Sequence, residues 1–169
     1  PEAVMVVLPA DHLILDEERY LKVIESAVEV AKQGENLVTL GIEPTHPETG
    51  YGYIDYQDKF ATINNEDVFE VNAFTEKPDK ETAERFIEDG TYLWNSGMFV
   101  WQVSTIRKMF AKHMPKLHQG LERMKEAIGT AREGQVLSEE FEKLDSISID
   151  YGIMEKADNI YVLSGSCGW

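Results

Sequence analysis

The pattern of apolar and polar positions predicts a strand, a helix and a second strand at the start of the chain. An unbroken apolar run from Val4 to Leu8 is typical of a strand buried on both faces of a parallel sheet. Apolar residues then recur at helical spacing between Tyr20 and Ala31, after an acidic start at Asp16. A second apolar run covers Asn36–Ile42. This order predicts a βαβ unit with a right-handed crossover, and therefore an α/β fold.

The remaining sequence divides into further strands and helices without a repeat or a domain boundary. Alternation on either side of a polar turn indicates a hairpin, and apolar residues at 3.6-residue spacing indicate helices. The expected elements are a hairpin of Tyr53–Tyr56 and Val68–Phe74 around Asn64–Asp67, a helix over Lys80–Asp89, a strand over Tyr92–Trp101, helical sequence over Val103–Ala131 broken at Pro115, a short helix over Ser138–Leu144, a helix capped by Ser148 or Asp150 and ending near Ala157, and a strand over Ile160–Leu163.

Composition narrows the class of protein. The 169 residues include 31 acids and 16 bases, and the resulting net charge of −15 argues against nucleic acid or an anionic membrane as partners, because both need a basic patch. A hydrophobic content of 43% fits one domain with a sizeable core. Cys167 is the single cysteine, which is typical of a reducing compartment. No apolar run reaches membrane-spanning length, so we expect a cytoplasmic protein.

An acid and an imidazole follow the first predicted strand. Asp11 and His12 come shortly after Pro9, which ends the apolar run. Open α/β sheets bind ligands at the carboxyl ends of their strands. A carboxylate in that place suits magnesium, which takes oxygen ligands from one or two acids and from substrate phosphates. An aspartate that merely caps the following helix is an equal alternative.

Residues 44–54 form a loop that carries two prolines, two glycines and two tyrosines. Gly50 and Gly52 can adopt backbone angles closed to other residues, so a ligand could lie against the main chain there. The alternative is a tight turn with packed aromatic rings, which is the more frequent explanation for such a loop when nothing else is known.

Glu76 and Lys77 stand where the predicted hairpin ends. Neighbours on an extended strand point to opposite faces, so both can line a site only where the chain leaves the sheet, and Pro78 favours such an exit. Glu76 would then accept hydrogen bonds from sugar hydroxyls, and Lys77 would place a positive charge on a phosphate. A solvated pair at the head of the next helix is the alternative.

The strand over Tyr92–Trp101 has a polar centre of Asn95, Ser96 and Gly97. An asparagine amide both donates and accepts hydrogen bonds, so Asn95 suits a sugar hydroxyl or an acetamido group. A bulge in which this side chain satisfies its neighbours' backbone is an equal alternative.

The motifs PADH, GYGYI, FTEKP, WNSGMF, SIDYGIMEK and CGW, in this order, resemble the mannose-1-phosphate guanylyltransferase family, the GDP-mannose pyrophosphorylases, within the sugar-1-phosphate nucleotidyltransferases. The resemblance covers essentially the whole chain, and FTEKP together with SIDY and MEK is specific to this branch. It implies an α/β nucleotidyltransferase fold, glycosyltransferase-A-like and Rossmann-like, with a mixed, mainly parallel sheet flanked by helices.

The resemblance also implies a reaction and a set of site residues. The reaction is magnesium-dependent transfer of GMP from GTP to mannose 1-phosphate, giving GDP-mannose and pyrophosphate. The implied residues are Asp11 as magnesium ligand and catalytic group, Gly52 as a backbone contact to the sugar, Glu76 as a hydroxyl clamp, Lys77 as the catalytic and substrate-binding phosphate cation, and Asn95 and Gly97 as further substrate contacts. Asp150 matches a motif position to which we assign no role.

Some of the family's groups fall outside these residues. Its glycine-rich GTP loop and guanine-recognising residues would precede Pro1, and its second metal-binding aspartate would follow Trp169. We therefore expect residues 1–169 to be part of one catalytic domain and inactive alone. Two alternatives stay open: transfer to another sugar 1-phosphate with UTP or dTTP, and a noncatalytic subunit that binds a sugar nucleotide. Whether the protein forms a homo-oligomer also stays open.

Overall fold

The structure, a computed structural model, describes residues 2–165 and 167–169. Its elements are β1 (Val4–Val7), α1 (Glu17–Lys32), β2 (Leu37–Ile42), β3 (Tyr53–Ile63), β4 (Glu66–Thr75), α2 (Lys80–Asp89), β5 (Tyr92–Gln102), α3 (Val103–His113), α4 (Pro115–Ala127), α5 (Glu133–Phe141), η1 (Asp150–Met154) and β6 (Ile160–Ser164). Among the helices of this described part, none combines the length and the apolar character that a membrane crossing requires.

A six-stranded mixed sheet organises the chain, in the order β1-β5-β2-β6-β4-β3, with a further pairing of β5 and β3. The expected α/β fold with helices on a mixed sheet is confirmed. Parallel pairing, however, is confined to β2 and β6 among the described strands, whereas the sequence predicted a mainly parallel sheet. The reason is that β3 and β4 form a hairpin and β5 runs back between β1 and β2, and both connections give antiparallel neighbours.

The first strand differs from its prediction. β1 pairs with β5 alone among the described strands, and its apolar side chains after the half-buried Val4 are exposed, with Met5 at 43% and Val7 at 38%. Burial on both faces, which we expected for Val4–Leu8, is therefore wrong for the described part of the chain. β1 and β2 do run parallel, because each is antiparallel to β5, but β5 lies between them. An apolar run predicts that a strand forms, but the elements that pack beside the strand determine how far its side chains are buried.

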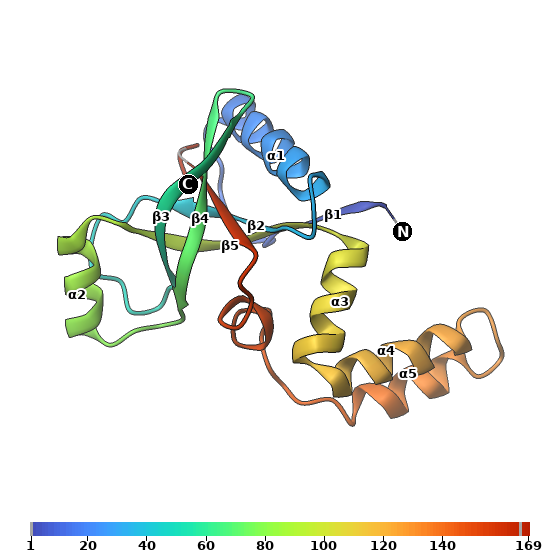
Figure 1. Cartoon of the computed structure of the whole chain (residues 1–169). Coiled ribbons are helices and arrows are strands. Elements are labelled where there is room, and N and C mark those ends of the chain that lie inside the picture. Colours follow the sequence, from blue (N-terminus) through green and yellow to red (C-terminus); the bar gives the residue numbers. More distant parts are fainter. Residues whose placement is uncertain (1, 166) are drawn as a thin grey trace.

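The two faces of the sheet carry separate apolar cores. Side chains alternate along β5, so that Met98 and Val100 pack in one cluster while Phe99 and Trp101 pack in the other. α1 covers the first face with an apolar stripe that includes the fully buried Val23. α3 and η1 cover the second face (Figure 1).

The helices α4 and α5 extend away from the sheet as an arm that begins where α3 ends (Figure 1). The expected break at Pro115 is confirmed, because α3 ends at His113 and Pro115 opens α4. Two other predictions were shifted. α5 covers Glu133–Phe141 instead of Ser138–Leu144, and the segment after Ile149 forms a π-helix over Asp150–Met154. The Ser148 hydroxyl accepts the backbone N–H of Tyr151 at 3.5 Å at the start of this helix, so of the two expected caps Ser148 is the one present.

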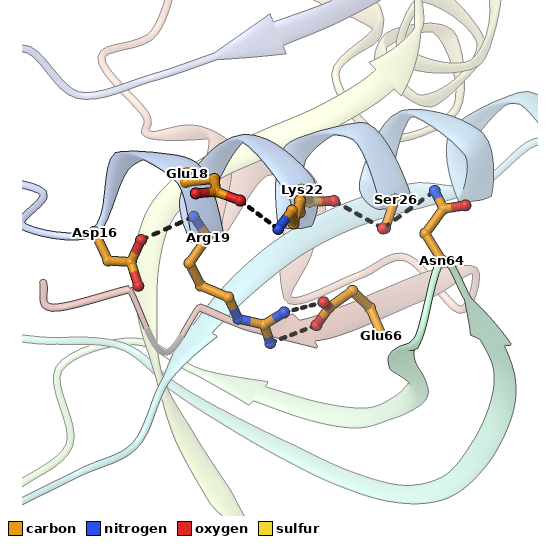
Figure 2. A network of polar contacts seen from close by, with 7 residues as sticks. All are labelled: Asp16, Glu18, Arg19, Lys22, Ser26, Asn64 and Glu66. Carbon is orange, nitrogen blue, oxygen red and sulfur yellow. Dashed lines mark hydrogen bonds and ion pairs between the residues drawn. The ribbon is translucent and has the colours of Figure 1, made fainter.

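One ion pair ties α1 to the β3–β4 hairpin (Figure 2). Both terminal nitrogens of Arg19 donate to the carboxylate of Glu66, with Nη2 at 2.6 Å from Oε2. The side chain of Glu66 is only 7% exposed. The hydrogen bond to Glu66 raises the pKa of Arg19, so the guanidinium stays charged. Asp16, which caps α1 by accepting the backbone N–H of Arg19 at 2.9 Å, fixes the same turn.

We expect Arg19→Met to lower the free energy of unfolding by about 3 kcal/mol, because it leaves the buried Glu66 carboxylate without its partner. Urea unfolding followed by circular dichroism measures this change. Lys22→Met on the same helix is the matched control, since the pair of Lys22 with Glu18 is exposed and should contribute little. Equal losses in the two variants would contradict a special role for the buried pair.

Candidate functional site

The chain leaves the sheet at Glu76 and Lys77, as the sequence predicted. β4 ends at Thr75, and Lys77 has a φ of 47°, in the left-handed region. The turn lets the two side chains meet, and Lys77 Nζ donates a hydrogen bond to Glu76 Oε1. The side chain of Glu76 is 7% exposed and that of Lys77 is 56% exposed. The buried carboxylate of Glu76 is therefore hydrogen-bonded to the solvent-accessible ammonium group of Lys77.

The positive charge of Lys77 is supported by its surroundings. The hydrogen bond to Glu76 raises the pKa of Lys77, partial burial opposes this, and the charges of Glu76, Tyr151 and Asp150 raise it further. The backbone N–H of Glu76 donates to Glu155 Oε1 at 3.2 Å. The pair is thus held between β4 and the η1 region, and Lys77 can meet an anion as a full cation.

Gly52 lies directly against this pair. A Cβ at this position would come within 2.5 Å of Glu76 Oε2 and 3.3 Å of Asn95 Cβ, so that only glycine fits without movement. Its carbonyl accepts the backbone N–H of Asn95 at 2.8 Å, and the carbonyl of Tyr51 accepts that of Lys77 at 3.2 Å. Gly52 therefore lets the Glu76 carboxylate and Asn95 come to one point, and the expected contact of a ligand with its backbone stays a prediction.

Asn95 is the centre of a set of polar contacts. Its amide nitrogen donates to Asp150 Oδ1 at 3.1 Å, and its amide oxygen accepts from Thr39 Oγ1 at 3.3 Å and from the backbone N–H of Gly97 at 3.1 Å. The register between β2 and β5 shifts at this point, so the predicted bulge is also present. Asp150, whose position in the family motif was left without a role, thus holds the Asn95 amide in place and contributes negative charge near Lys77.

Asp11 lies on the exposed loop between β1 and α1. Asp16, and not Asp11, caps the helix, so the alternative of a capping role for Asp11 is wrong. No hydrogen bond or ion pair involves the Asp11 side chain within the described chain. Its carboxylate is therefore available to an external ligand.

The loop that carries Asp11 is fixed by the last described residues. Trp169 Nε1 donates to His12 Nδ1 at 2.8 Å, and the backbone N–H of Asp16 donates to the carbonyl of Cys167 at 3.0 Å. The Trp169 ring lies edge-on to that of Tyr51, with ring centroids 5.7 Å apart. Since Tyr51 precedes Gly52, this chain of contacts links the Asp11 loop to the Gly52 contacts. Sequence reasoning had the CGW motif but missed this role of its tryptophan.

A second contact joins the same loop to β5. A Cβ at Gly97, whose φ is 71°, would lie 3.5 Å from Pro9 Cγ. Pro9, two residues after the end of β1, therefore packs beside Gly97 of β5, two residues after Asn95. The structure brings Gly52, Glu76, Lys77 and Asn95 together. The Asp11 loop is connected to them through the contact of Pro9 with Gly97 and through the contacts of Trp169 with His12 and Tyr51.

The carboxyl groups do not form a complete metal site by themselves. Across residues 2–165 and 167–169, no three His, Cys, Asp or Glu side chains are grouped to hold a metal ion. Magnesium is commonly bound by one or two carboxylates together with substrate phosphates and water. A single free carboxylate such as Asp11 fits that kind of binding, in which the substrate completes the ligand set.

Comparison with known proteins gives a consistent result. The sequence profile of the Nucleotidyl transferase family matches residues 1–136. A mannose-1-phosphate guanylyltransferase of Sinorhizobium fredii is 38% identical over 99% of this chain and 32% of its own length, and one of Escherichia coli is 37% identical over 98% of this chain and 36% of its own length. The chain thus spans about a third of these curated relatives.

A solved structure agrees with these relatives. The crystal structure of mannose-1-phosphate geranyltransferase from Thermus thermophilus matches with a TM-score of 0.81 and 37% identity, over 96% of this chain and 44% of that one. Its fold is shared over nearly the whole described sheet and its helices. With the family profile covering most of the residues and the identity extending from end to end, the chain belongs to the nucleotidyl transferase family.

Proposed function

We propose that this chain supplies the sugar-phosphate site of a mannose-1-phosphate guanylyltransferase, which transfers GMP from GTP to mannose 1-phosphate and releases pyrophosphate. The observation that carries the proposal is the pairing of a buried Glu76 with an accessible Lys77, beside Gly52 and Asn95. Such a site suits a ligand with hydroxyl groups at one end and an anion at the other. The names of the relatives, all similar over almost the whole chain, support the choice of sugar and nucleotide.

In this proposal the four groups divide the recognition of the sugar phosphate. Glu76, held by Lys77 on one oxygen and lying against Gly52 with the other, would accept a hydrogen bond from a sugar hydroxyl. The exposed ammonium of Lys77 would contact the phosphate as a compact charge. The amide of Asn95, oriented by Asp150, would contact a second part of the sugar. Fixed groups of this kind lower the activation barrier of the transfer, because the entropy of aligning the reactants is lost on binding and not in the reaction step.

The reaction itself is an in-line displacement at phosphorus. An oxygen of the sugar phosphate attacks the α-phosphorus of GTP, the bond between that phosphorus and the bridging oxygen breaks, and pyrophosphate leaves with the bonding pair. Lys77 would offset the repulsion between the two anionic reactants. Asp11 would hold a magnesium ion, which when bound supplies charge neutralisation on the phosphate oxygens.

We propose this activity for the full-length protein, because the chain corresponds to about a third of its curated relatives. The glycine-rich GTP loop implied by the resemblance is not among the 169 residues, so residues 1–169 should bind a sugar phosphate without turning it over. A cytoplasmic location, which the single cysteine suggested, and the oligomeric state stay predictions.

The test compares nucleotide and sugar pairs on the full-length protein. Pyrophosphate release should require magnesium and should be fastest with GTP and mannose 1-phosphate, compared with UTP or dTTP and glucose 1-phosphate. A preference for UTP or dTTP would contradict the proposed specificity and favour another sugar-1-phosphate transferase. Binding of GDP-mannose without any turnover would instead favour a noncatalytic subunit.

A further inference from the structure

A cavity separate from the residues of the candidate site lies in the helical arm. It has a volume of about 820 Å³, is partly open to solvent, and is lined by the junction of α3 and α4, the end of α5 and the segment that leads to η1. Apolar side chains form most of its wall, namely Met114, Pro115, Leu117, Phe141, Leu144 and Ile147. Small-molecule sites in proteins have volumes of roughly 300–1,000 Å³ and similar apolar linings. The cavity therefore has the size and the character of a ligand site.

Lys156 brings an unneutralised positive charge to this wall. Across the part of the chain that the structure describes, each of the other ten lysines forms an ion pair with an aspartate or a glutamate, and Lys156 forms none. This is unexpected in a chain with 31 acids and 16 bases, where carboxylates are in excess. The unpaired ammonium at an apolar cavity is complementary to an anion.

The other charged groups at the cavity do not compete with Lys156. Lys116 is neutralised by Asp145 at 2.8 Å. Burial lowers the pKa of His113, and the charges of Lys112 and Lys156 lower it further, so this imidazole is neutral at neutral pH. The hydroxyl groups of two serines, Ser146 and Ser148, add hydrogen-bonding groups to the wall. The cavity thus combines one free cation, neutral donors and a large apolar surface.

We propose that this cavity binds a small amphipathic anion, with an aromatic or branched aliphatic body against Phe141, Leu144 and their apolar neighbours and one anionic group on Lys156. A compact molecule fits the volume of this partly open cavity, and the single unpaired ammonium among its described lining residues fits a single negative charge. A nucleotide is less suitable, because its several phosphate charges would meet only one free ammonium and the Asp145 carboxylate.

The cavity is connected to the candidate site through packing and hydrogen bonds of η1. A Cβ at Gly152 would lie 2.6 Å from Met114 Sδ, so this cavity residue packs tightly on η1. The backbone N–H of Gly152 donates to the carbonyl of Ser148, another cavity residue, at 2.9 Å. Asp150, in the same π-helix, holds the amide of Asn95. A ligand that displaces Met114 or Ser148 would therefore shift Asp150 and change the binding of sugar phosphate, so we infer that the ligand is an effector.

The binding step is tested on the full-length protein with 8-anilinonaphthalene-1-sulfonate, a fluorescent aromatic anion. We expect saturable binding that Lys156→Gln weakens by about fivefold, the loss of one partly exposed charge contact. Phe141→Ser should weaken it as well and should leave folding intact, since Phe141 is 70% exposed. The matched controls are Lys112→Gln and Leu137→Ser, which change the same residue types outside the cavity wall.

An uncharged probe distinguishes the contribution of the Lys156 charge to binding from that of the apolar wall. N-phenyl-1-naphthylamine should bind equally well to the original protein and to Lys156→Gln, and less well to Phe141→Ser. Equal binding of the sulfonate by both cavity variants and both controls would overturn the proposal. So would the absence of any probe binding to the full-length protein, because the cavity would then be covered by a second copy or another segment.

The effector step rests on the proposed function and has its own measurement. The sulfonate should change the apparent KM for mannose 1-phosphate in the original protein, and Lys156→Gln should need about fivefold more sulfonate for the same change. An unchanged KM in both proteins, at saturating probe, would overturn the connection through η1. A protein that binds the probe but releases no pyrophosphate would instead count against the guanylyltransferase proposal, and the cavity result would stand.

Discussion

Asp11→Asn should reduce magnesium-dependent turnover of the full-length protein by at least about 100-fold, the scale seen when one preorganised charge-stabilising group is removed. The substitution keeps the size of the side chain and removes the negative charge that would hold the cation. Stability should hardly change, because Asp11 is exposed and forms no hydrogen bond or ion pair within the described chain. Pyrophosphate release at several magnesium concentrations, together with urea unfolding, measures both effects.

Asp16→Asn is the matched control for this experiment. It removes one charge from the same connection between β1 and α1, but the Asp16 carboxylate already caps α1 by accepting the backbone N–H of Arg19. Asparagine is about as good a capping residue as aspartate, so helix α1 should be retained and turnover with it. If both variants kept full activity, the metal role of Asp11 would be wrong. If both lost activity equally, the loop and not the Asp11 carboxylate would be responsible.

Local patterns predicted the elements that depend on local chemistry. The helix over Lys80–Asp89 has the predicted bounds, with Asp79 accepting a hydrogen bond at its start and Gly90 at φ 70° at its end. The predicted hairpin turn over Asn64–Asp67 contains the observed one at Asn64 and Asn65, both with positive φ, whereas Glu66 and Asp67 already belong to β4. Asparagine tolerates this conformation better than most residues. These features are encoded within a few residues of each other, and a single sequence is enough to find them.

Features that depend on distant neighbours could not be predicted in the same way. The exposure of β1 follows from what lies beside it, and the apolar run from Val4 to Leu8 is the same in a central strand and in an edge strand. The amide of Asn95 meets Asp150, and the indole of Trp169 meets His12, across long stretches of chain. Motif order indicated that these residues belong to one site, but only coordinates reveal which side chain orients which.

Lys77→Ala should raise the KM for mannose 1-phosphate by about 10- to 100-fold and leave the KM for GTP nearly unchanged. The change removes a charge-assisted contact with the phosphate, and such contacts contribute roughly 1.5 to 3 kcal/mol. It also leaves the Glu76 carboxylate, 7% exposed, without its cation next to an anionic ligand. Lys80→Ala is the matched control, because the side chain of Lys80 is exposed and pairs with Glu84 one turn further along the same helix, α2.

The backbone at Lys77 allows function and stability to be separated. A non-glycine residue at φ 47° stores strain that glycine would avoid, and strained residues of this kind gather at functional sites. Lys77→Gly should therefore be more stable than Lys77→Ala, because both variants remove the partner of the Glu76 carboxylate and only glycine relieves the left-handed backbone, while the two should weaken sugar-phosphate binding equally. Urea unfolding and the KM for mannose 1-phosphate give the two readouts. If either variant bound the sugar phosphate normally and only stability changed, Glu76 and Lys77 would be a solvated structural pair at the head of α2, and the strain would need another explanation.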